Sequence, residues 1–222
     1  MQDVRDLLVS SPSAAAAAAA AGKYEIKHDK DGNTSVVGLT VKEVRTMADV
    51  DALMKVAAAA RSTGATHSNA HSSRSHSVYT MRLYLDHGVT AQSRSGILHM
   101  IDLAGSERIA KSGVNNMEAG GSEKLLKETQ NINKSLSCLS TVVMALKAGA
   151  SHVPFRNSKL TYLLQHSLGG NCKTLMLCNL NPLHAHTSES LATLRFAKAV
   201  TEVTNAPGAA GGVAAAGAGA AH

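Results

Sequence analysis

The alternation of hydrophobic and polar positions along the chain predicts several strands. Residues 25–44 carry two β-prone runs on either side of Asp31-Gly32, which is typical of a hairpin. Residues 78–85 alternate as a strand does, and the apolar run at 97–101 predicts a buried parallel strand. A final strand is predicted over 174–180.

Apolar residues at helical spacing predict four helices between and after these strands. The helices are expected over residues 49–61, 132–149, 160–170 and 188–200. In the second of them, one apolar stripe should face the core, and it consists of Ile132, Leu136, Leu139, Val143 and Leu146. Pro154 prevents that helix from continuing. Strands interspersed with helices predict an α/β fold.

Composition changes this picture in two ways. The Ser- and Ala-rich stretch at 10–22 predicts a low-complexity insertion, and residues 207–222 are a Gly/Ala-rich tail. The net charge of +6 favours an acidic partner, either nucleic acid or an acidic protein surface. With no Trp, two Phe and four Tyr, the chain lacks the aromatic platforms of single-stranded nucleic-acid binders, so a protein polymer is favoured.

Targeting signals and cysteine chemistry add little. The spacing of Cys138, Cys172 and Cys178 matches no metal motif, and we expect reduced thiols in the core. No stretch reaches the roughly 20 apolar residues of a membrane span. The alanine run at 14–21 lacks a basic leader and makes a poor signal peptide. A cytoplasmic location is therefore expected.

The strongest candidate chemistry follows the run at 97–101, in Asp102 to Arg108, DLAGSER. A carboxylate at the end of a strand can hold a Mg²⁺ ion through its water molecules, as Asp102 would. Gly105 offers a backbone N–H with no side chain in the way. Such a group can contact a terminal phosphate and release it after hydrolysis, which turns chemistry into loop movement.

A second motif precedes it, in Asn69 to His76, NAHSSRSH. Ser72 and Ser73 supply hydroxyls suited to Mg²⁺ or phosphate oxygens, and Arg74 supplies a fixed positive fork. Glu107 is the natural anion for Arg74, so an ion pair between the two segments would close only around a bound triphosphate. Taken singly, each motif is more often an ordinary turn or strand end.

In this order, the two motifs make the chain resemble the kinesin motor family. NAHSSRSH resembles the family's switch I and DLAGSER its switch II. The resemblance continues through four later blocks: NINKSL (131–136), HVPFRNSKLT (152–161), LLQHSLGG (163–170) and LRFA (194–197). Residues 24–44 are most similar to the minus-end-directed kinesins with a C-terminal motor. The segment after switch II is longer than usual around 115–121, and a bulge into solvent is the favoured explanation.

The resemblance implies a three-layer P-loop NTPase fold with a central mixed sheet, here incomplete. No G-x-x-x-x-G-K-[ST] phosphate loop occurs in the 222 residues. We expect the second half of a motor, with a motor remnant and the insertion over 1–22, the motor part over 23–206 and a disordered tail over 207–222. A truncated gene model is the favoured origin, while an expression fragment and a half-motor paralogue stay open.

The resemblance also implies roles for named residues, with ATP and Mg²⁺ as cofactors. Ser73 and Asp102 would hold the metal, Gly105 would sense the γ-phosphate, and Arg74 with Glu107 would align the attacking water. Asn69 and Ser72 would complete the nucleotide site. The microtubule would be contacted by Arg108, His152, Arg156 and Lys159.

The predicted function is therefore that of a kinesin-like microtubule motor in the cytoplasm, on the microtubule cytoskeleton. Because the phosphate loop is absent, we expect little ATPase activity from this chain alone. A non-catalytic microtubule-binding pseudo-motor or module is the alternative. Neither a nucleic acid nor a membrane is an expected partner, and dimerisation is left open because the end of the chain shows no heptads.

Overall fold

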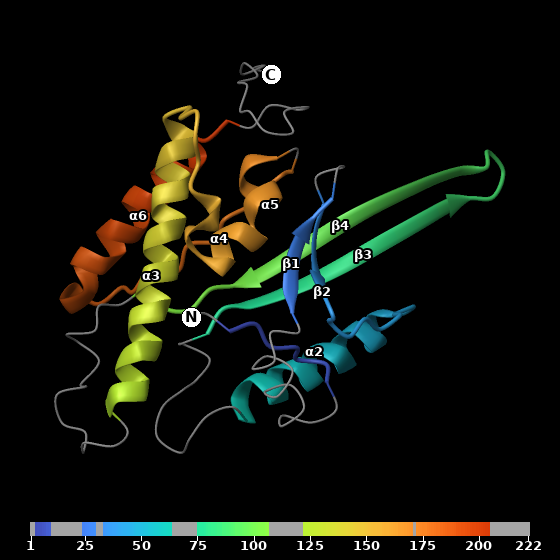
Figure 1. Ribbon diagram of the computed structural model, residues 1–222, viewed down its shortest axis with the longest axis horizontal. Helices are drawn as coiled ribbons and strands as arrows, with labels where there is room; N and C mark the ends of the chain where they lie inside the picture. The colour runs from blue at the N-terminus through green and yellow to red at the C-terminus, as the bar shows by residue number, and fades with distance from the viewer. Residues whose placement is uncertain are drawn as a thin grey trace.

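The computed structural model describes residues 3–9, 24–29, 33–63, 75–106, 122–170 and 172–204 (Figure 1). Its elements, in chain order, are β1 (Glu25–His28), β2 (Thr34–Val37), α2 (Met47–Thr63), β3 (Ser77–His87), β4 (Gln92–Asp102), α3 (Ser122–Lys147), η4 (Phe155–Asn157), α4 (Lys159–Leu163), α5 (Gln165–Gly169), η5 (His184–His186) and α6 (Thr187–Thr201). The predicted insertion at 10–22, the tail at 207–222 and the lengthened segment at 115–121 lie outside the described residues.

The described strands form two separate antiparallel hairpins. β1 pairs with β2 from Glu25 opposite Val37 to His28 opposite Thr34, as the sequence pattern predicted. β3 and β4 pair along their whole length and project away from the helices (Figure 1). The expected central mixed sheet is thus represented, within the described residues, by these two hairpins.

The prediction of a buried parallel strand at 97–101 is wrong. β4 runs antiparallel to β3, because a four-residue turn at 88–91 joins them and parallel strands need a much longer crossover. Ile97, Leu98 and Ile101 are 38%, 48% and 37% exposed. In the described part of the chain, β4 has β3 as its only strand neighbour, and its apolar side chains remain partly exposed.

The final strand predicted over 174–180 is also absent from the described structure. This segment has no strand partner among the described residues, and a strand needs a neighbour to satisfy its backbone groups. Leu175 and Leu177 are 84% and 80% exposed. Their alternation with Met176 and Cys178, both half-buried, is the sequence pattern that suggested a strand.

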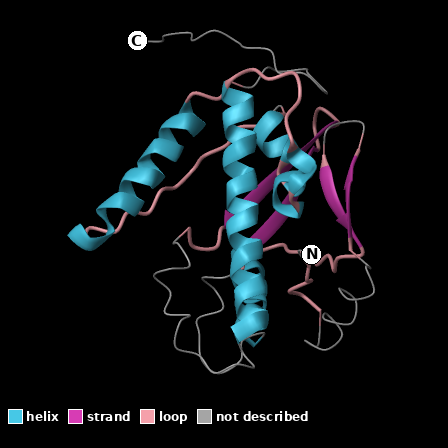
Figure 2. Cartoon of the chain, turned by 60° about the vertical axis from the view of Figure 1, so that its left-hand side comes forward, coloured by secondary structure: helices cyan, strands magenta, loops and turns pink. Residues whose placement is uncertain are grey.

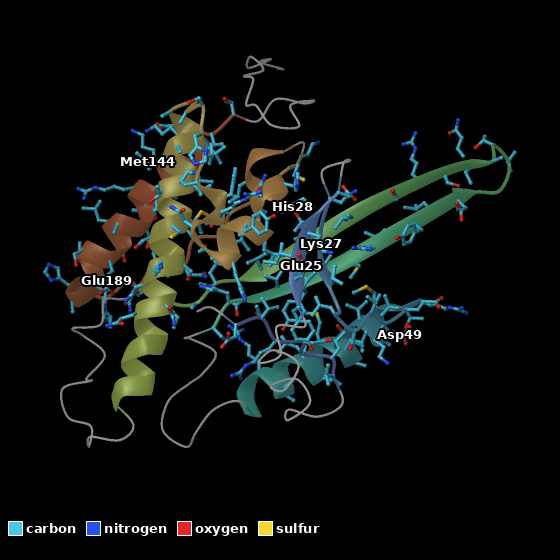
Figure 3. All side chains as sticks on the ribbon, in the orientation of Figure 1. Glu25, Lys27, His28, Asp49, Met144 and Glu189 are labelled. Atoms are coloured by element: carbon cyan, nitrogen blue, oxygen red, sulfur yellow. The ribbon has the colours of Figure 1, made fainter. Side chains whose placement is uncertain are left out.

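Helix α3 forms the centre of the helical part and lies between α6 and the pair α4–α5 (Figures 1 and 2). The predicted inward stripe is confirmed at four of its five positions, since Leu136 is only half-buried. Val142, which the stripe omitted, is fully buried. Met144, 53% exposed, lies on the outer face of the helix (Figure 3).

The helix predicted over 160–170 is divided into α4 and α5 at Leu164, whose ψ of 3° departs from the helical value. α4 begins at a firm cap. The Ser158 hydroxyl accepts a hydrogen bond from the Thr161 N–H at 3.0 Å, and the fully buried Thr161 hydroxyl donates to the Phe155 carbonyl at 2.6 Å. The turn from η4 into α4 is therefore held by buried hydrogen bonds.

The first hairpin is attached to these helices through an aromatic cluster. The His28 ring lies edge-on to Tyr162 of α4, with centroids 4.4 Å apart, and 4.8 Å from His166 of α5 (Figure 3). The chain just after the hairpin is held by the N-terminal segment. Buried Asp6 accepts hydrogen bonds from the N–H groups of Leu8 and Thr40, at 2.8 and 2.6 Å. The N-terminal segment 3–9 is thereby tied to the end of the hairpin.

Helix α2 begins with a reciprocal cap. The Thr46 hydroxyl accepts from the Asp49 N–H at 3.2 Å, and the Asp49 carboxylate accepts from the Thr46 N–H at 2.9 Å. Hydrogen bonds from the Arg45 and Thr46 backbone N–H groups and from the Thr46 side chain lower the pKa of Asp49. This cap sets the helix start at Met47, two residues before the predicted start.

The three cysteines are unpaired, and their predicted place in the core is wrong. Cys138 and Cys178 are half-buried and Cys172 is exposed. Among the described helices, none is both long and apolar enough to cross a membrane.

We predict that Leu146→Ala lowers the free energy of unfolding by about 2–5 kcal/mol, because it leaves a cavity beside Val142 and Val143. Leu175→Ala is the matched control, and its effect should stay within about 0.5 kcal/mol because that side chain is 84% exposed. Urea unfolding followed by circular dichroism measures both. Equal effects of the two substitutions would contradict the assigned core.

Candidate functional site

The described parts of the two sequence motifs, residues 75–76 and 102–106, lie at one end of the β3–β4 hairpin. Ser77, the first residue of β3, lies directly opposite Asp102, the last residue of β4. Of the two motifs, residues 75–76 lead into the hairpin and residues 102–106 leave it at this same end. The antiparallel register therefore brings together the described parts of two motifs that lie about 25 residues apart in the sequence.

Arg61, at the end of α2, joins the two strand ends. Its Nη1 donates to Asp102 Oδ2 at 2.6 Å, its Nε donates to the Ser75 hydroxyl at 3.1 Å, and its Nη2 donates to the Ser75 carbonyl at 2.6 Å. The Arg61 side chain is 13% exposed, whereas the Asp102 side chain is 65% exposed. The nearly buried Arg61 guanidinium thus holds the accessible Asp102 carboxylate in place.

His76 makes a second connection between the same segments. Its Nδ1 accepts a hydrogen bond from the Ala104 N–H at 3.0 Å, and its Nε2 lies 2.7 Å from the hydroxyl of Ser135 on α3. Burial lowers the pKa of His76, the positive charge of Arg61 lowers it further, and Asp102 opposes this shift. The ring is therefore neutral at neutral pH.

Sequence reasoning missed Arg61 and Ser135 and gave His76 no role. Arg61 stood at the end of a predicted helix, where a basic residue is ordinary. Ser135 lay inside the NINKSL block but carried no chemistry of its own. His76 belonged to the first motif, yet nothing in its neighbourhood along the chain indicates Ala104 or Ser135 as partners.

The predicted site residues divide into two groups. Asp102, Gly105, His152, Arg156 and Lys159 lie within the described structure. The others lie outside the described residues, so the predicted ion pair between Arg74 and Glu107 remains a prediction: Asn69, Ser72, Ser73, Arg74, Glu107 and Arg108. Gly105 is half-buried and follows buried Ala104, at the end of the hairpin that also carries Asp102.

The carboxylate of Asp102 suits a metal contact that is made through water. It is exposed at the end of a strand, and a guanidinium fixes its direction, as the outer partners of metal ligands commonly do. The described residues contain no cluster of three or more His, Cys, Asp or Glu side chains that could hold a metal ion directly. Of the predicted metal contacts Ser73 and Asp102, the described structure includes only Asp102.

A second candidate surface lies on the turn that follows α3. His152, Arg156 and Lys159 are all exposed there, and the Arg156 guanidinium lies over the Tyr162 ring with its carbon 5.9 Å from the centroid. The Ser158 and Thr161 hydrogen bonds hold the backbone between Arg156 and Lys159. Arg156 and Lys159 are therefore presented from a turn next to α3 that these hydrogen bonds hold.

Comparisons with known proteins identify the family of this chain. The family model for the kinesin motor domain matches residues 1–203. Kinesin-like protein KIN-14N of Oryza sativa subsp. japonica is 51% identical over 197 residues, which is 89% of this chain and 25% of that protein. Kinesin-like protein KIN-14D of Arabidopsis thaliana is 49% identical over 205 residues, with 90% and 25% covered.

Solved structures show the same likeness. The motor domain of kinesin-like protein Kar3 from Saccharomyces cerevisiae is 43% identical with a TM-score of 0.67, covering 88% of this chain and 55% of that one. A structure described as a fast kinesin has a TM-score of 0.70 at 39% identity, covering 82% and 50%. This chain belongs to the kinesin motor domain family, and its predicted fold class is confirmed. It spans about a quarter of the length of the curated relatives and about half of the solved motor chains.

We predict that Arg61→Ala destabilises the protein by about 1.5–3 kcal/mol, because it removes the charged hydrogen bond to Asp102 and two hydrogen bonds to Ser75. The control is Arg94→Ala, at an exposed position of β4, which should cost at most about 0.5 kcal/mol. Urea unfolding provides both values. If Arg61→Ala behaves like Arg94→Ala, Arg61 does not hold the strand ends together.

We also predict that stability falls in mildly acidic solution. Burial is the main cause that lowers the pKa values of His28, His76 and His99 below 6.5 in the folded protein. The unfolded chain therefore binds more protons as the pH falls below 6.5, and the stability present above that value is lost as the pH passes through the folded-state pKa values. Urea midpoints at about pH 7.5 and about pH 5 measure the effect, and an unchanged midpoint would contradict it.

Proposed function

We propose that this chain is the part of an ATP-driven microtubule motor that senses the nucleotide and contacts the microtubule. The observation that carries the proposal is the register that places Ser77 opposite Asp102. Residues 75–76 and 103–106 thus lie at the same end of the hairpin, so a change in one switch-like segment would reach the other. Membership of the kinesin motor domain family supports the same function.

The nucleotide chemistry would depend on positioning and on electrostatics. Ser73 and Asp102 would hold Mg²⁺, which neutralises phosphate charge when it is bound. Arg61 keeps the Asp102 carboxylate turned to a fixed position at the strand end. Gly105, whose backbone is free of a side chain, would contact the terminal phosphate, and the pair of Arg74 and Glu107 would close over the attacking water.

The microtubule side would use His152, Arg156 and Lys159, together with Arg108. The net charge of +6 and the exposure of the first three residues suit an acidic polymer. Because buried hydrogen bonds hold the turn at Ser158 and Thr161, these cations would bind with little loss of backbone entropy. This binding would place the protein on the microtubule cytoskeleton in the cytoplasm.

A non-catalytic microtubule-binding module is the second candidate. The turn that carries Arg156 and Lys159 supports it, because both side chains are exposed on a turn that its own buried hydrogen bonds hold, with no part played by a nucleotide. A motor's affinity for its track depends on the nucleotide, whereas the affinity of a simple binder does not.

We predict that the full chain sediments with microtubules and that the variant Arg156→Glu/Lys159→Glu sediments much less. Each lost ion pair is worth up to about 1 kcal/mol, roughly a five-fold rise in Kd. Lys42→Glu is the control for a charge reversal outside the proposed surface. Lys42 is exposed and precedes α2, more than 100 residues before Arg156 in the sequence. Salt should weaken binding of the wild type. Equal sedimentation of the double variant and the wild type would refute the proposed surface.

The same assay separates the two candidate functions. It is repeated with ATP and Mg²⁺, with ADP and Mg²⁺, and without nucleotide. An affinity that differs among these conditions supports the motor, and an affinity that stays constant supports the non-catalytic module. Circular dichroism of each variant shows whether the fold is retained.

A further inference from the structure

We propose that His76 is a positioning residue that joins the end of β4 to helix α3 through an unbroken series of three hydrogen bonds. The Ala104 N–H donates to His76 Nδ1 at 3.0 Å, His76 Nε2 lies 2.7 Å from the Ser135 hydroxyl, and that hydroxyl donates to the Ile132 carbonyl at 2.7 Å. The series contacts all three elements around it, since His76 directly precedes β3, Ala104 follows β4, and Ser135 belongs to α3.

The direction of each bond follows from the donors that are available. A backbone N–H can only donate, so His76 Nδ1 must carry no proton. In a neutral imidazole the proton then sits on Nε2, which donates to Ser135. The Ser135 hydroxyl keeps its own hydrogen for Ile132. The geometry therefore selects one tautomer and one orientation at every step.

The partners of His76 are protected from water, and the ring itself is half-buried. Ser135 is 0% exposed, Ala104 is 4% exposed and Ile132 is 9% exposed. Where water cannot replace a lost partner, the remaining donor or acceptor is left unpaired, which costs free energy. Loss of one hydrogen bond of the series therefore weakens the others. The charged groups close to the ring are Arg61 of α2 and Asp102 of β4, which are paired with each other.

The position of His76 bears on how the end of β4 is coupled to helix α3. Along the chain, the end of β4 is linked to the start of α3 only through residues 103–121, whereas His76 links Ala104 to the middle of α3 directly. Ala104 lies next to Gly105, the residue that would contact the phosphate. Under the proposed function, a displacement of this backbone would reach α3, beside the cationic turn, without passing through the intervening segment.

The first measurement needs no substitution. Nitrogen-15 NMR of the full chain at neutral pH should show His76 as the neutral tautomer protonated at Nε2, with Nδ1 as an acceptor. A ring protonated at Nδ1 would overturn the proposal, because the Ala104 N–H would then have no acceptor on it.

The second measurement tests whether α3 affects the strand end. Ser135→Ala removes the hydroxyl between His76 and Ile132, and the Ala104 amide should exchange its hydrogen roughly ten-fold faster. Ser140→Ala is the matched control in the same helix. Its hydroxyl also donates to a helix carbonyl, that of Leu136 at 3.2 Å, but Ser140 is exposed and the variant should leave Ala104 exchange unchanged.

A double-mutant cycle separates this coupling from a general loss of stability. His76→Phe keeps a flat ring but removes both nitrogens, so Ser135→Ala should add little when it is introduced into His76→Phe. If Ser135→Ala and Ser140→Ala change Ala104 exchange equally, or if the two substitutions of the cycle are fully additive, the proposal fails. These readings involve no microtubules, so a failure of microtubule binding would count against the proposed function and leave the His76 connection standing.

Discussion

The pairing of the start of β3 with the end of β4 is the constraint on which the candidate site depends. Antiparallel strands joined by a short turn place their free ends side by side, so Ser77 and Asp102 must be neighbours. Arg61 and His76 then bind this end to α2 and to α3. The elements that form the candidate site are thereby held together at the paired strand ends.

Arg61 and His76 make these connections through different kinds of interaction. Arg61 is a charged, nearly buried fork that holds an accessible carboxylate, and it joins segments mainly by electrostatic attraction. His76 is neutral and works through directed hydrogen bonds whose partners are almost fully buried. The first fixes where a carboxylate points, and the second transmits position between a strand end and a helix. Together they connect this end of the hairpin to both α2 and α3.

The opposite end of the same hairpin is open. Tyr84, Leu85 and Val89 are 74%, 62% and 91% exposed there, and elsewhere Leu175 and Leu177 are 84% and 80% exposed. Exposed apolar surface commonly marks a place where other protein surface packs. The solved kinesin motor chains are about twice as long as the part of them that this chain covers. The helical part, by contrast, buries its own apolar stripe along α3.

The sequence by itself determined the local elements and the candidate chemistry. Periodicity predicted the first hairpin, α2, β3, α3 and α6, because it reflects which side chains a single element buries. The spacing of NAHSSRSH and DLAGSER carried the family, which the comparisons confirmed. It also placed Asp102 at the end of a strand, where the structure has it.

Only the tertiary structure decided the direction and burial of β4 and the fate of residues 174–180. A run of apolar residues shows that these side chains favour burial. It does not show which strand or helix, if any, packs against them. The partners of Arg61 and His76 were decided in the same way. They lie 14 to 59 positions apart along the chain, and hydrogen bonds between such residues exist only after packing brings their atoms within about 3 Å.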